Sequence, residues 1–100
     1  MKFEEYQEAA RRTALYPNRL KNLEYPTLGL TGEAGEVANI VKKFQRDFGG
    51  EITDEIRLKL KDELGDVLWY ISACADELGL TLNEIAEYNV AKLAERHNRK

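Results

Sequence analysis

The stretch from Thr27 to Lys100 contains no proline, because the only two prolines of the chain are Pro17 and Pro26. Proline is the residue that most strongly breaks a helix interior. Within this stretch apolar residues recur at alternating steps of three and four, which places them on one face of an α-helix. The pattern therefore predicts an all-α protein.

Four helices follow from this periodicity and from the residues that interrupt it. Gly49 and Gly50 end one apolar pattern, and Gly79 ends the next. Thr81 and Glu84 form a capping box that begins the last helix. The expected helices cover about residues 3–14, 27–48, 54–78 and the segment after Thr81. One hundred residues suffice for one domain and not for two, so we expect a single four-helix bundle-type domain, residues 1–100.

Composition excludes several classes of protein. The net charge of −3 argues against a dedicated nucleic-acid binder. The longest apolar run, Val67 to Ile71, is too short to span a membrane. Cys74 is the only cysteine, so no internal disulfide is possible and a reducing compartment fits. The acidic start lacks the apolar run of a signal peptide. We therefore expect a cytoplasmic protein with no nucleic-acid or membrane partner.

Two four-residue motifs share one pattern: Glu33-Ala34-Gly35-Glu36 and Glu63-Leu64-Gly65-Asp66. In each, two acids lie three residues apart, which makes them neighbours on one helix face, where like charges repel. Each motif also places a glycine inside a helix, which destabilises the helix by roughly 1 kcal/mol relative to alanine. Two costs repeated in the same pattern indicate a functional site.

Helix geometry brings the two motifs together. At about 100° per residue, both pairs of acids lie roughly 60° and 120° from the centre of their apolar stripe, on the same rotational side. The short connection at Gly49-Gly50 makes the two helices antiparallel. Folding there sets Glu33 opposite Asp66. It likewise sets Glu36 opposite Glu63. We therefore expect four carboxylates to converge at one height beside the core.

Four close carboxylates do not all stay ionised without a compensating cation. Magnesium fits, because proteins bind it through carboxylates together with substrate phosphates. A di-iron site would need Glu-x-x-His pairs, and the only histidine, His97, lies outside both motifs. Chance spacing of acids on charged helices explains either motif alone better than it explains both.

The chain resembles the all-α nucleoside triphosphate pyrophosphohydrolase superfamily, and in particular its short MazG-like members. The shared segments are 6–7, 29–37, 42–43, 63–70 and 89–96. The resemblance implies Mg²⁺-dependent hydrolysis between the α- and β-phosphates of a nucleoside triphosphate, with Glu33, Glu36, Glu63 and Asp66 as metal ligands and Mn²⁺ as a possible substitute. It further implies a role in clearing unwanted nucleotides. The choice of scissile bond rests on the resemblance alone.

Two residues beside the acids are candidates for substrate binding. Tyr70 follows Asp66 by four positions, so it projects next to the acids, where it either contacts the nucleotide or packs at the core edge. Lys43 lies near the angular position of Glu36 and is a candidate phosphate contact. For the base, Tyr6, Gln7 and the irregular stretch 16–26 are positioned to approach, and the sequence does not indicate which base is preferred.

Three residues of the last helix share one side. Asn89 falls between apolar positions, where a buried amide needs hydrogen-bond partners. Lys92 and Arg96 follow at steps of three and four. Together the three could hold triphosphate oxygens, arginine through a two-pronged contact. The alternative is ordinary positive charge near a helix C-terminus.

The second and third helices carry apolar residues on more than one stripe. A domain of this size has little helix surface to cover them, and apolar faces left over on bundles are usually interfaces. We therefore expect a homodimer or a dimer of dimers. Proteins that the chain resembles place their substrate pocket near the subunit contact, which implies that the second subunit partly encloses the nucleotide. Two other readings remain: a non-catalytic module that binds nucleotide or metal, and a structural oligomerisation module with solvated acids. The apolar residues that lie outside the main stripes of the second and third helices are Leu28, Ala38, Ile40, Leu58, Leu68, Trp69 and Ala75.

Overall fold

A computed structural model describes residues 1–99. It contains four helices, and no strand occurs within those residues. The predictions of an all-α fold and of four helices are confirmed. The helices are α1 (Phe3–Arg11), α2 (Glu24–Asp47), α3 (Asp54–Glu77) and α4 (Leu82–Asn98).

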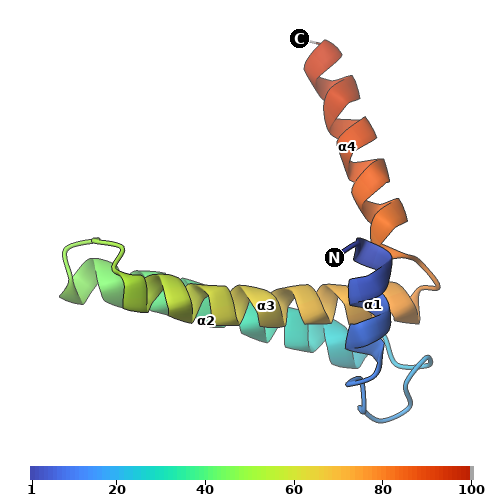
Figure 1. The fold of residues 1–100 in the computed structure, drawn as a ribbon, viewed down its shortest axis with the longest axis horizontal. Coiled ribbons are helices and arrows are strands. Elements are labelled where there is room, and N and C mark those ends of the chain that lie inside the picture. Colours follow the sequence, from blue (N-terminus) through green and yellow to red (C-terminus); the bar gives the residue numbers. More distant parts are fainter. Residues whose placement is uncertain (100) are drawn as a thin grey trace.

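Helices α2 and α3 form an antiparallel hairpin and lie side by side along their lengths (Figure 1). The chain reverses at Gly49 and Gly50, whose φ angles of 63° and 80° are conformations that glycine adopts without a steric penalty. Thr53 then caps α3, because its side chain accepts a hydrogen bond from the backbone N–H of Ile56. The predicted hairpin is present.

Two predicted helix ends were wrong. Helix α2 begins at Glu24, three residues before the predicted start, and it includes Pro26. Proline is tolerated there because the first turn of a helix does not need its N–H groups. Helix α1 ends at Arg11, whereas the prediction extended it to Ala14. The residues after Arg11 form a turn with bonds between positions three apart, which tighten the end of the helix.

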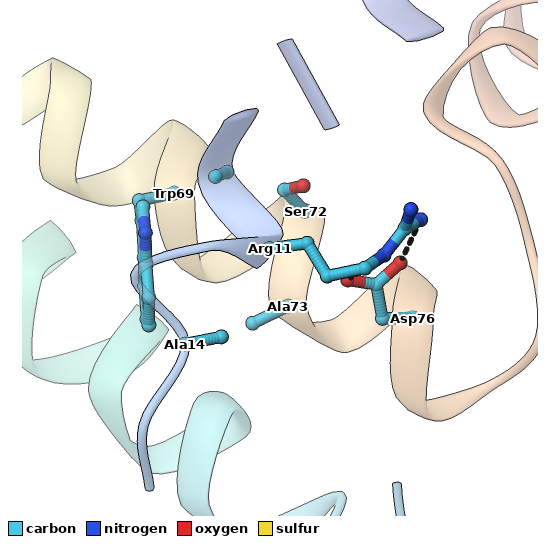
Figure 2. A pocket seen from close by; sticks show the side chains of 7 residues that line it. Arg11, Ala14, Trp69, Ser72, Ala73 and Asp76 are labelled. Atoms are coloured by element: carbon cyan, nitrogen blue, oxygen red, sulfur yellow. Dashed lines mark hydrogen bonds and ion pairs between the residues drawn. The ribbon is translucent and has the colours of Figure 1, made fainter. Parts of the chain in front are cut away.

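Helix α1 lies across the end of α3 (Figure 1). Figure 2 shows the contact: Ala14 faces Ala73 of α3, and Arg11 reaches Asp76, to which its Nη2 donates at 2.8 Å. The buried Gln7 amide donates to Asp76 at 2.8 Å and accepts from the backbone N–H of Leu82 at 2.9 Å. Helix α1 therefore joins the end of α3 to the start of α4.

The segment between α1 and α2 is held by one carboxylate of α3. Glu77 accepts hydrogen bonds from the Tyr16 hydroxyl and from the backbone N–H groups of Leu20 and Asn22, the last two at 2.7 Å. Leu20 has a φ of 72°, a conformation that a leucine adopts only when its surroundings impose it. Tyr16 stacks on Tyr25 with ring centroids 4.8 Å apart. Glu77 thereby fixes this segment beside the hairpin.

Helix α4 begins at the predicted capping box of Thr81 and Glu84. It contacts α1 near its start and then runs away from the hairpin (Figure 1). The radius of gyration is 16.3 Å, compared with about 13 Å for a compact domain of this length. The four helices of the predicted bundle are present, but α4 does not close the bundle within one chain. None of the helices in residues 1–99 is long and apolar enough to cross a lipid bilayer.

Candidate metal centre

Three carboxylates from the two helices of the hairpin meet at one level. Glu33 comes from α2, and Glu63 and Asp66 come from α3. Each offers a carboxylate oxygen, and these three atoms lie within 4.8 Å of one another. Glu33 and Glu63 are half-buried between the helices, and Asp66 is exposed. Antiparallel pairing of the two motifs therefore produces the cluster, as the spacing predicted.

Glu36, the fourth predicted acid, lies outside this group of three. It is exposed and lines a separate hollow of about 270 Å³, beside Asn39 and Lys42. Its larger angle from the apolar stripe agrees with its greater exposure, since Glu33 is half-buried. Its charge still acts on the cluster, because it helps to raise the pKa of Glu63.

The carboxylates of the cluster repel one another. A hydrogen bond with Glu33, partial burial and the charges of neighbouring acids raise the pKa of Glu63 to about 7. Burial first, and then the charges of Glu33 and Asp62, raise the pKa of Asp66. No salt bridge among residues 1–99 involves Glu33, Glu63 or Asp66. Such a cluster suits a hard divalent cation that prefers oxygen ligands.

An aromatic hollow opens beside the acids. It measures about 340 Å³ and is lined by Thr13, Glu33, Asp66, Trp69 and Tyr70, and its size is that of a small-molecule site. Trp69 and Tyr70 meet edge to face with centroids 5.0 Å apart. The Trp69 indole N–H donates to the Thr13 hydroxyl at 2.8 Å, which fixes the ring. Tyr70 lies beside the acids, as predicted.

Glycine at position 29 makes room for Tyr70. A Cβ atom on Gly29 would overlap the Tyr70 ring. Burial, and then the charges of Tyr25, Glu33 and Asp66, raise the pKa of Tyr70. The sequence analysis missed the roles of Gly29 and Thr13. The sequence feature that could have indicated a role for Gly29 is a glycine inside a helix one turn before Glu33, because such a glycine often has a packing or functional reason.

Some candidate residues for the base pocket have other roles. Gln7 is buried, and its amide is used in the bonds that join α1, α3 and α4, so it is a structural residue. Tyr6 does approach the site: burial and then the charge of Asp66 raise its pKa.

The predicted phosphate contacts are not brought to the acids within one chain. Lys43 is exposed on α2 and lines neither the aromatic hollow nor the hollow beside Glu36. Asn89, Lys92 and Arg96 lie on α4, which points away from the hairpin (Figure 1). Asn89 is exposed, so the expectation of a buried amide is not met within one chain.

Comparisons with known proteins agree with the geometry of the hairpin. Residues 21–100 match the family model described as the MazG nucleotide pyrophosphohydrolase domain. The chain is 46% identical over 99 residues to the Gene 37 protein of Mycobacterium phage L5, which covers 94% of this chain and 87% of that protein. No solved structure matches the chain.

Proposed function

The chain belongs to the MazG nucleotide pyrophosphohydrolase domain family, and from this premise we propose that it hydrolyses nucleoside triphosphates to a nucleoside monophosphate and pyrophosphate. Glu33, Glu63 and Asp66 would hold magnesium, with Glu36 one helical turn along α2 as a further ligand. Manganese, which also accepts oxygen ligands, would substitute. Removal of unwanted nucleotides is the proposed role.

The observation that carries this proposal is the cluster of three carboxylates within 4.8 Å at the positions of the two acidic motifs, which has no ion-pair partner among residues 1–99. Magnesium bound there supplies neutralisation of phosphate charge and a more acidic water. A cluster carboxylate accepts the proton of the attacking water.

The aromatic hollow receives the nucleoside part of the substrate in this proposal. Trp69 offers a ring fixed by its bond to Thr13, and Tyr70 offers a hydroxyl close to the carboxylates. Aromatic walls beside a charged cluster suit a ligand with a planar base at one end and phosphates at the other.

Product analysis tests the proposal. The protein is incubated with a panel of ribo- and deoxyribonucleoside triphosphates and Mg²⁺, and the products are followed by phosphorus-31 NMR. We expect monophosphate and intact pyrophosphate, no reaction with EDTA, and recovery with Mg²⁺ or Mn²⁺. Diphosphate and orthophosphate would overturn the assignment of the scissile bond.

Two other outcomes support the alternative readings. Stabilisation by Mg²⁺ and nucleotide without turnover indicates a non-catalytic binding module. No response to either ligand indicates a structural module whose acids are solvated.

A further inference from the structure

The hydroxyl group of Thr13 connects the turn after α1 to the wall of the aromatic hollow. It donates its hydrogen to the backbone carbonyl of Ala10 at 2.9 Å, and it accepts the indole N–H of Trp69 at 2.8 Å. A threonine hydroxyl has one hydrogen to donate and two lone pairs that accept. Its hydrogen is therefore used, and one lone pair remains. Since Thr13 lines the hollow, its hydroxyl binds a further group there only as an acceptor.

The other polar side chains that line the hollow add more acceptors than free donors. Glu33 and Asp66 carry carboxylates, which accept hydrogen bonds when they are ionised. The Trp69 N–H is a donor, but Thr13 already accepts its hydrogen. The remaining donor among the lining side chains is the Tyr70 hydroxyl. A ligand that approaches Thr13 and Trp69 therefore meets a lone pair and no free hydrogen.

Nucleoside bases differ at one exocyclic position in a way that this lone pair distinguishes. Adenine and cytosine carry an amino group there, which donates, whereas thymine and uracil carry a keto oxygen, which accepts. An amino group that faces Thr13 donates to the free lone pair. A keto oxygen places a second acceptor against it and leaves both oxygens without a donor. A site that hydrogen-bonds a substrate N–H discriminates against an analogue that lacks it.

We propose that Thr13 selects nucleotides whose base carries an exocyclic amino group, such as those of cytosine and adenine, over nucleotides with a keto oxygen at the same position. Trp69 fixes this preference, because its N–H occupies one lone pair of the hydroxyl and leaves Ala10 to accept the hydrogen. Thr13 contacts the base in this inference and takes no part in metal binding. The inference rests on the proposed function, which assigns the hollow to the nucleoside.

Matched pairs of substrates test the preference. CTP and UTP differ in the exchange of an amino for a keto group and in the protonation of the adjacent ring nitrogen, and so do ATP and ITP. For each substrate kcat/KM is measured with Mg²⁺. We expect a value about tenfold higher for the amino member of each pair, the effect of about one hydrogen bond. Equal values, or higher values for UTP and ITP, would overturn the inference and leave the hydrolase function standing.

Substitution of Thr13 tests whether its hydroxyl causes the preference. Thr13→Val keeps the shape of the side chain and removes the hydroxyl, so the Trp69 N–H becomes a free donor in the hollow. We expect the preference to reverse in favour of UTP and ITP, with circular dichroism as the folding control. Thr13→Ser keeps the hydroxyl and should keep the wild-type preference. An unchanged preference in Thr13→Val would overturn the inference.

Two further variants serve as controls for the Thr13 hydroxyl. Thr31→Val also removes a hydroxyl that donates to a helix carbonyl, at 3.1 Å, but Thr31 does not line the hollow. Its rates and its preference should equal those of the wild type. Tyr70→Phe removes the other O–H of the lining and should keep the preference for amino bases. Loss of the preference in Tyr70→Phe but not in Thr13→Val would assign the selection to Tyr70 and overturn the inference.

A binding measurement gives a readout that does not depend on hydrolysis. Trp69 is the only tryptophan of the chain and lines the hollow, so a base that enters the hollow should change its fluorescence. The protein is titrated with CMP, UMP, AMP and IMP, and we expect tighter binding of CMP and AMP. This preference without hydrolysis of any triphosphate would refute the proposed function and keep the inference. Hydrolysis together with equal affinities, or with no change in fluorescence, would refute the inference and keep the function.

Discussion

Helix α3 carries two pairs of acids whose surroundings are opposite. Asp76 and Glu77, at its end, accept hydrogen bonds from several groups of α1 and the segment that follows it. Burial alone would raise the pKa of Glu77, but the bonds it accepts hold that pKa below its ordinary value. Glu63 and Asp66, about three to four turns earlier, face other carboxylates, and their pKa values are raised.

The difference separates acids that hold the fold from acids that need a ligand. A carboxylate surrounded by donors stabilises the folded state in its charged form, whereas a carboxylate among other acids destabilises the folded state when it ionises. The same residue types on one helix therefore perform two tasks. Which task an acid performs follows from the donors that tertiary structure brings to it.

Neutralising an acid of the cluster should have the largest effect. We expect Asp66→Asn to lower kcat/KM by about 100-fold or more, by analogy with loss of one group that stabilises transition-state charge. The fold should be retained, because the substitution relieves repulsion with Glu33. Steady-state kinetics with circular dichroism as the folding control checks both parts. Normal turnover by Asp66→Asn would show that the cluster acids are not needed for hydrolysis, and would contradict the distinction between Glu63 and Asp66 and the pair Asp76 and Glu77.

Removing an acid of the other pair should act on stability. Asp76→Ala removes one of the two acceptors of the Gln7 amide and the carboxylate that pairs with Arg11, and we expect a loss of about 2 kcal/mol in the free energy of unfolding. That corresponds to a fall in Tm of roughly 8–16 °C for a domain of this size. Asp62→Ala, an exposed acid of the same helix, is the matched control and should change stability by less than about 0.5 kcal/mol. Equal effects of the two substitutions would refute the structural role of Asp76.

A substitution at Gly29 should change the aromatic hollow while leaving every carboxylate of the cluster in the sequence. Gly29→Ala places a methyl group where the Tyr70 ring lies, so the ring must move away from the carboxylates. We expect kcat/KM to fall by about tenfold, since small misplacements at a site are costly. Gly32→Ala is the control, because a Cβ atom there meets open space. If both variants kept full activity, the placement of Tyr70 would not matter for turnover.

The smallest expected effect is a pH dependence of stability in the metal-free protein. The pKa of Glu63 is about 7 in the folded chain and near its ordinary value of 4.5 in the unfolded chain. Between these values the folded state binds more protons, so stability falls as pH rises from about 4.5 to 7. Urea denaturation in EDTA from pH 5 to pH 8 should show this decline, and Glu63→Gln should flatten it. An equal decline in the variant would assign the effect to another group.

The hairpin was predictable because its signals are local. The apolar periodicity, the Gly49-Gly50 turn and the Thr53 cap are each read within a few residues, and the level of the acids follows from antiparallel pairing. The start of α2 was missed because Pro26 was read as a break, although the first helical turn accepts proline.

The remaining features depend on contacts that no local pattern encodes. Glu77 meets Leu20 and Asn22 across more than fifty positions of sequence, and nothing near Glu77 distinguishes it from the solvated acids of the same helix. Glu36 and Glu33 share one motif, yet only Glu33 points into the cluster. Periodicity likewise placed Asn89 on the packing face of α4, but it does not specify which chain covers that face.

Direct metal binding tests the central distinction between the two pairs of acids. Mg²⁺ is titrated calorimetrically at pH 8 into the wild type, Asp66→Asn and Asp76→Asn, each kept below its unfolding temperature. We predict binding by the wild type, an affinity at least about tenfold lower for Asp66→Asn, and wild-type affinity for Asp76→Asn. Equal affinities of the wild type and Asp66→Asn would contradict the assignment of the cluster as the metal centre.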